Sequence, residues 1–147
     1  MVGLFDVNVL VALAWPNHIH HARALDWFRE HSPLGWATCS ITETGFVRVS
    51  SNRAAVPEAR SPREATALLR RITGLPRHAF WSDDVPFADA RFVPIENVLG
   101  HQQVTDAQLL ALALRHRGRL VTFDTRIRAL VPNTRGADKS VAVIGAD

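Results

Sequence analysis

The sequence predicts a single α/β domain in which helices flank both faces of a central, mostly parallel sheet. One observation is that short apolar segments typical of buried strands alternate with stretches whose apolar residues recur at helical spacing. Another is the length of 147 residues, 47% of them hydrophobic, with no internal repeat or low-complexity linker. This length suits one sizeable core and is too short to suggest two, so residues 1–147 are expected to form one domain.

The first third of the chain predicts two strands, each followed by an acidic residue. The predicted elements are, in order, a strand over residues 2–5, a helix over residues 8–15, a helix over residues 18–30, a strand over residues 35–39 and a helix that is capped by Ser40 or Thr42 and runs to Ser51. Pro16 ends the first helix, since proline lacks the N–H group that a helix interior requires. Asp6 therefore lies at the carboxyl end of a strand, and Glu43 lies in the first turn of the helix after the next strand.

The rest of the chain repeats this arrangement. The predicted elements are a helix over residues 61–71, a strand over residues 79–81, a short helical turn over residues 87–91, a helix capped by Thr105 and ended by Gly118, a strand over residues 119–123 and a strand over residues 141–144. Ser61, Pro62 and Glu64 together form a helix-capping signal. Asp106 is expected in the first turn of the penultimate helix, and Asp124 directly after a buried strand.

Arginine dominates the basic side chains. The chain has 17 Lys and Arg residues against 14 Asp and Glu residues, and Lys139 is the only lysine. The guanidinium group binds phosphate oxygens bidentately, so this composition suits a polyanionic partner. A codon bias that replaces lysine by arginine explains the composition equally well. Two basic stretches are candidates for contact with a phosphate backbone, namely Arg60, Arg63, Arg70, Arg71 and Arg77, and Arg115, Arg117 and Arg119.

Cysteine usage and hydropathy indicate a soluble cytoplasmic protein. Cys39 is the only cysteine, which excludes an intrachain disulfide, and no zinc-binding spacing is present. The apolar N-terminal run lacks a basic leader and contains Asp6 and Asn8, which argues against a signal peptide. No segment approaches the roughly 18 unbroken apolar residues of a membrane span, so no membrane partner is expected.

Four acidic residues, Asp6, Glu43, Asp106 and Asp124, are candidates for a common site. Ligands of open α/β sheets bind beyond the carboxyl ends of the strands, and three of these acids map to such ends or to the following helix. Converging carboxylates repel one another unless a divalent cation neutralises them, and oxygen ligands favour Mg²⁺ or Mn²⁺. Such an ion activates water and stabilises charge on a phosphoryl oxygen, which predicts phosphodiester hydrolysis with one metal ion or two.

Each acid also has a purely structural explanation. Asp106 and Glu43 fit the positive end of a helix dipole, and Asp6 and Asp124 fit the end of a strand. The strand-end explanation does not account for an acid at position 6, because Asp6 interrupts a stretch that is apolar on both sides. A buried carboxylate without a partner is costly.

Four segments carry a further pattern, namely Phe5-Asp6-Val7-Asn8, Ile41-Thr42-Glu43-Thr44-Gly45-Phe46, Val104-Thr105-Asp106-Ala107 and Leu120-Val121-Thr122-Phe123-Asp124. In this order they resemble the motifs of VapC-type toxins of the PIN-domain ribonuclease family, over nearly the whole chain. The resemblance implies a PIN-like three-layer fold and a Mg²⁺- or Mn²⁺-dependent endoribonuclease that cuts structured RNA, such as tRNA or rRNA. It also implies a VapB-like antitoxin as partner, so that a homodimer or a toxin–antitoxin hetero-oligomer is expected.

The resemblance assigns catalysis and metal binding to the matching acids, Asp6, Glu43, Asp106 and Asp124. Asn8 and Thr122 match the polar positions beside the first and last acids, where hydrogen bonds to carboxylates or to water on the metal are expected; a turn or capping role fits them equally well. His101 precedes the third motif, where it can reach RNA or assist proton transfer, or be a solvated loop residue. An arginine of the antitoxin is expected to insert among the carboxylates and block them.

Two other classes of protein remain as alternatives. One is a phosphotransfer protein on a similar sheet, but a dehalogenase-like phosphatase needs a second aspartate where this chain has Asn8. A receiver domain needs an acidic pair near the N-terminus and a catalytic lysine, for which Lys139 is weak support. The other alternative is a non-catalytic module whose acidic pocket binds a basic peptide.

Overall fold

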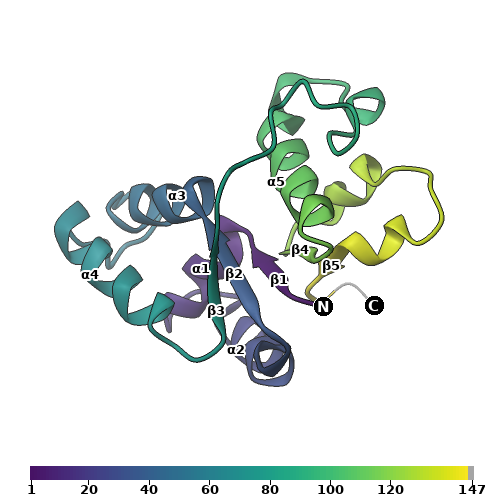
Figure 1. Cartoon of the computed structure of the whole chain (residues 1–147). Helices are drawn as coiled ribbons and strands as arrows, with labels where there is room; N and C mark the ends of the chain where they lie inside the picture. The colour runs from purple at the N-terminus through teal and green to yellow at the C-terminus, as the bar shows by residue number, and fades with distance from the viewer. Residues whose placement is uncertain (146–147) are drawn as a thin grey trace.

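Five short parallel strands within residues 1–145, the part of the chain that the structure describes, form one sheet (Figure 1). The structure is a computed structural model. The strands are β1 (Gly3–Phe5), β2 (Trp36–Cys39), β3 (His78–Trp81), β4 (Arg119–Thr122) and β5 (Val141–Val143). Their order across the sheet is β3-β2-β1-β4-β5, and every neighbouring pair is parallel. The predicted parallel α/β architecture is confirmed.

Helices cover both faces of this sheet. The α-helices of the described segment are α1 (Val7–Ala14), α2 (His21–His31), α3 (Ser40–Ser50), α4 (Pro62–Thr73) and α5 (Val104–Arg115). Helix α5 packs on one face against Leu4 and Leu120, whereas α1 to α4 pack around Phe5, Trp36 and Val121 on the other. Figure 1 shows α5 on the opposite side of the sheet from α3 and α4. No helix within residues 1–145 has both the length and the hydrophobicity needed to cross a bilayer.

The central position of β1 brings distant parts of the chain together. Strand β1 lies between β2 and β4, with Phe5 opposite Val121. The backbone N–H of Asp6 continues this pairing by donating to the carbonyl oxygen of Val121 at 2.9 Å. The start of α1 therefore lies beside the end of β4, although the two are more than a hundred residues apart in sequence.

Helices α1 and α3 approach each other closely near their first turns. Helix α3 begins at Ser40 with Cys39 as its N-cap, so the predicted cap at Ser40 or Thr42 is wrong. The Cys39 N–H donates to the hydroxyl of Thr42 in the first turn at 3.0 Å. Gly45 of α3 faces Val7 of α1, and a Cβ atom on Gly45 would lie 2.5 Å from Val7 Cγ2. Only glycine permits this separation, so the start of α1 depends on the packing of α3.

Two predicted helix starts are wrong. Helix α2 begins at His21 rather than near residue 18, because the preceding residues form a turn in which the His20 N–H donates to His18 Nδ1. Helix α5 begins at Val104, directly after a 3₁₀ helix over His101–Gln103, so Thr105 is not its cap.

The segment between β3 and α5 also differs from the prediction. The helical turn predicted over residues 87–91 is absent, since Asp89 forms separate turns with Pro86 and Val93 and directs its carboxylate at Arg91. Short 3₁₀ helices were missed here and elsewhere, at Ser32–Leu34, Ile95–Asn97, His101–Gln103, Thr125–Leu130 and Ala137–Ser140. Such segments are only three to six residues long and leave no periodic pattern in the sequence.

Candidate functional site

Asp6 occupies the junction of β1 and α1. Its Oδ1 accepts a hydrogen bond from the Val7 N–H at 2.7 Å, and its Oδ2 accepts one from the Thr122 hydroxyl at 2.8 Å. Burial raises the pKa of Asp6, the two hydrogen bonds oppose this rise, and the negative charge of Asp124 adds to it. Asp6 is therefore partnered by the protein and also affected by a second carboxylate.

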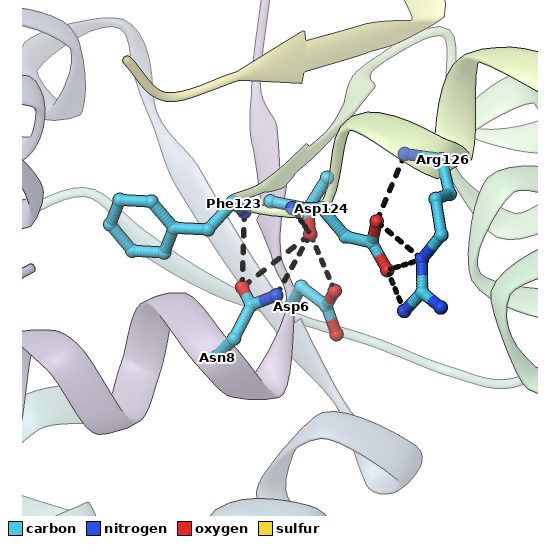
Figure 2. A network of polar contacts seen from close by, with 6 residues as sticks. Asp6, Asn8, Phe123, Asp124 and Arg126 are labelled. Atoms are coloured by element: carbon cyan, nitrogen blue, oxygen red, sulfur yellow. Dashed lines mark hydrogen bonds and ion pairs between the residues drawn. The ribbon is translucent and has the colours of Figure 1, made fainter. Parts of the chain in front are cut away.

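Thr122 connects β4 to the start of α1. Its side chain is almost fully buried, and its oxygen accepts hydrogen bonds from Asn8 Nδ2 at 3.0 Å and from the Asp124 N–H at 3.1 Å. Asn8 in turn accepts a hydrogen bond from the Phe123 N–H at 3.3 Å (Figure 2). This network sets Asp6 and Asp124 in a fixed relation to each other, and it contains both polar residues that the sequence singled out.

Asp124 directs its carboxylate at Arg126 (Figure 2). Asp124 caps the 3₁₀ helix Thr125–Leu130, and the Arg126 guanidinium forms a fork on it, with Nε 2.9 Å from Oδ1 and an Nη 2.7 Å from Oδ2. This hydrogen-bonded cation lowers the pKa of Asp124. Arg126 is not among the residues predicted from the sequence, because the 3₁₀ helix that places it beside Asp124 leaves no periodic pattern.

Asp106 lies in the first turn of α5 and is half-buried. Burial raises its pKa to about 6, the negative charges of Asp6 and Asp124 add to the rise, and the positive charge of Arg126 opposes it. The three aspartates are thus close enough for their charges to interact, although Asp6 follows β1, Asp106 lies in α5 and Asp124 follows β4. The structure brings these three predicted residues together.

Glu43 is held in a separate environment. Its Oε1 accepts a hydrogen bond at 2.7 Å from the hydroxyl of Thr38, which also lies 2.7 Å from His78 Nε2. The Glu43 charge affects the pKa of His78 and is not among the charges that shift Asp106 or Asp6. Sequence analysis predicted neither Thr38 nor His78, because contacts between neighbouring strands cannot be deduced from local spacing.

The donor set suits a hard divalent cation, but its present geometry does not surround one. Carboxylate oxygens are the ligands that Mg²⁺ and Mn²⁺ prefer, and a cation would relieve the repulsion by Asp6 and Asp124 that adds to the effect of burial on the pKa of Asp106. Within residues 1–145, however, no three Asp, Glu, His or Cys side chains converge on one point. Arg126 binds both oxygens of Asp124, so a cation shared with Asp6 and Asp106 would have to displace this guanidinium.

Other predicted substrate contacts lie at different distances from the acids. His101 is exposed in the 3₁₀ helix that leads into α5, five residues before Asp106. Arg115 and Arg117 precede β4 and Arg119 is its first residue, whereas Asp6 and Asp124 follow β1 and β4. These arginines therefore lie at the opposite ends of the strands from the two acids. Arg119 also stacks on Trp27, 5.1 Å from the ring centroid. The arginines of α4 are exposed to solvent, namely Arg63, Arg70 and Arg71.

This fold and its group of carboxylates define a recognised class of protein. A profile of the PIN domain matches residues 4–131. The chain therefore belongs to the PIN-domain family.

Two relatives that are named ribonucleases narrow the class of protein further. Ribonuclease VapC39 of Mycobacterium tuberculosis is 50% identical over 127 residues, which cover 86% of this chain and 91% of that protein. Ribonuclease VapC38 of the same organism is 49% identical over 129 residues, covering 88% of this chain and 89% of that protein. Within the PIN-domain family, the chain is a VapC-type ribonuclease, a hydrolase rather than a phosphotransfer protein.

Solved structures show the same fold at low sequence identity. VapC20 of Mycobacterium tuberculosis, described as a sarcin-ricin loop cleaving toxin, superposes with a TM-score of 0.60 at 16% identity, covering 86% of this chain and 93% of that one. VapBC2 of Rickettsia felis, bound to a DNA fragment from its promoter, gives a TM-score of 0.58 at 14% identity, covering 88% and 93%.

Proposed function

We propose that the chain is a Mg²⁺- or Mn²⁺-dependent endoribonuclease that hydrolyses phosphodiester bonds in structured RNA. The observation that carries this proposal is the grouping of Asp6, Asp106 and Asp124: burial raises the pKa of Asp106 to about 6, and the negative charges of Asp6 and Asp124 add to the rise. A group of carboxylates that destabilises itself in this way is suited to receive a cation. Structured RNA is the proposed substrate class, since VapC20 is described as cleaving the sarcin-ricin loop.

In this proposal Asp6, Asp106, Asp124 and Glu43 are the residues that would hold the metal. A bound divalent cation supplies Lewis-acid stabilisation of the phosphoryl oxygens and makes water a better nucleophile. Thr122 and Asn8 orient Asp6 and the backbone of Asp124 through their hydrogen bonds. His101, exposed ahead of α5, contacts the RNA.

A VapB-like antitoxin is the proposed partner, and the two proteins form a hetero-oligomer in the cytoplasm. The Rickettsia felis structure contains such a toxin and antitoxin together. The Arg126 fork on Asp124 in the present chain supports an arginine as the blocking residue, because a guanidinium group already binds one of these carboxylates. An arginine from the antitoxin that bound Asp6 and Asp106 in the same manner would neutralise the site and exclude both metal and substrate.

The test uses the purified protein, freed of any partner, with total bacterial RNA in Mg²⁺, in Mn²⁺ and in EDTA. Discrete fragments are expected with either metal and not with EDTA. Asp6→Asn should abolish them, whereas Asp26→Asn, which removes an exposed carboxylate on α2, should leave them unchanged. Fragments that persist with EDTA or with Asp6→Asn would contradict the proposed site.

A further inference from the structure

A chain of two hydrogen bonds connects Glu43 to His78 through Thr38. Thr38 is fully buried near the end of β2, and its hydroxyl lies 2.7 Å from Glu43 Oε1 and 2.7 Å from His78 Nε2. His78 is the first residue of β3, the strand next to β2. Three elements, β2, β3 and α3, therefore meet at one hydroxyl group.

The number of available protons determines which group donates in each of these two hydrogen bonds. A threonine hydroxyl has one proton to donate, and an ionised carboxylate has none. Because Glu43 can only accept, the Thr38 proton points at Oε1. The second 2.7 Å contact then requires His78 Nε2 to carry a proton and to donate it to the Thr38 oxygen. The hydrogen bonds thus run from His78 through Thr38 to Glu43.

The surroundings of His78 hold its ring in place. The ring lies against Trp36, with 4.6 Å between the ring centroids. Trp36 is itself fully buried, and its indole N–H donates to the carbonyl oxygen of Pro76 at 3.1 Å, just ahead of β3. The packing of Trp36 therefore fixes the orientation of the His78 ring, which donates to Thr38.

The side chain of Glu43 also borders open space. It lines a cavity of about 460 Å³ between α3 and α4, whose wall includes Arg48. Open space therefore borders Glu43 on this side, and the hydrogen bond from Thr38 fixes the position of its Oε1.

We infer that Thr38 and His78 are positioning residues for Glu43 in RNA cleavage. Together they hold Glu43 Oε1 at the end of β2 and leave Oε2 without a hydrogen bond from residues 1–145, so that it is available to metal or substrate. The inference rests on the role proposed above for Glu43.

Four variants test the chain of hydrogen bonds. Thr38→Val and His78→Phe each remove a link at similar volume, whereas Thr38→Ser and His78→Gln retain a hydroxyl and an N–H donor. Cleavage of total bacterial RNA is expected to slow about 10- to 100-fold in the first pair, the range typical of residues that orient ligands, and to recover in the second pair. Thermal melting identifies the variants that are folded.

Glu43→Gln separates this inference from the proposed function. If Glu43→Gln is inactive while folded Thr38→Val and His78→Phe cleave at the wild-type rate, the positioning inference is wrong and the proposed function stands. If Glu43→Gln itself cleaves at the wild-type rate, the positioning inference and the proposed role of Glu43 are both wrong, whereas the proposed ribonuclease activity is tested separately by Asp6→Asn.

A spectroscopic measurement on the wild-type protein does not depend on the folding of any variant. ¹⁵N chemical shifts distinguish an imidazole protonated at Nε2 from one protonated only at Nδ1. His78 is expected to carry its proton at Nε2 and to lose that preference in Thr38→Val. An Nδ1-protonated ring in the wild-type protein would overturn the inference.

Discussion

At the scale of single residues, Asp106 is the aspartate whose charge the fold disfavours most clearly. Its pKa rises from 3.8 to about 6, so the folded protein holds a proton on Asp106 that the unfolded chain has released. The stability that this proton confers is fully present below pH 4 and is lost as the pH rises to about 6.

Asp106→Asn should therefore stabilise the protein at alkaline pH while abolishing cleavage. The expected gain near pH 8 is roughly 1 kcal/mol after allowance for solvent screening of a half-buried group, and it should vanish near pH 4. Urea unfolding at both pH values measures it, with Asp26→Asn as a control. A variant that is less stable than the wild type near pH 8 would show that the Asp106 charge is well tolerated.

Arg126 is the second residue with a distinct expected effect. Its guanidinium competes with any cation for Asp124, so Arg126→Gln should raise the affinity for Mn²⁺, and only a few-fold because exposed ion pairs are weak. Arg126→Lys keeps the positive charge and loses the two-pronged contact with Asp124, so its Mn²⁺ affinity should lie between those of the wild type and Arg126→Gln. Titration of free Mn²⁺ by electron paramagnetic resonance gives the affinities, with Arg117→Gln as the control at the other end of β4. Weaker binding in Arg126→Gln would mean that Arg126 supports the metal site rather than competing for it.

At the scale of elements, the contact of α1 with α3 determines where Asp6 lies. Gly45→Ala places a Cβ atom 2.5 Å from Val7 Cγ2 and must displace the first turn of α1. The expected cost is about 1–3 kcal/mol of the free energy of unfolding, together with slower cleavage.

Val7→Ala in the same chain should relieve the overlap and restore part of both losses. Urea unfolding and RNA cleavage of the two single variants and the double variant measure the coupling. Additive losses in the double variant would mean that the two helices do not depend on this contact.

The elements also show what the sequence can and cannot predict. The apolar strands and the acid after β1 and after β4 were predicted, because hydrophobic runs and chain breaks are local signals. The separation of Glu43 from the three aspartates was not predicted from the sequence. It depends on the contact of Thr38 with His78 across the β2–β3 pair. Arg126 was missed because its role arises from a 3₁₀ turn too short to leave a periodic pattern.

At the scale of the whole molecule, a divalent cation should connect the stability of the fold to pH. Binding to the native state alone raises the melting temperature, and Mn²⁺ must replace any proton on Asp106. The increase caused by Mn²⁺ is therefore expected to be large near pH 8 and small near pH 5, below the Asp106 pKa of about 6.

Thermal melting with Mn²⁺ and with EDTA measures this difference. Asp6→Asn should remove most of the increase at both pH values. An increase that is equal at pH 5 and pH 8 would place the cation away from Asp106.

The order of strands in the sheet also determines when the proposed acidic site can form during synthesis. Strand β1 is synthesised well before its sheet neighbour β4, because more than a hundred residues separate the two. A nascent chain that has reached the end of α4 carries Asp6 and Glu43 but neither Asp106 nor Asp124. The growing polypeptide therefore cannot assemble the proposed acidic site until β4 has docked against β1, and cleavage is expected only after that step.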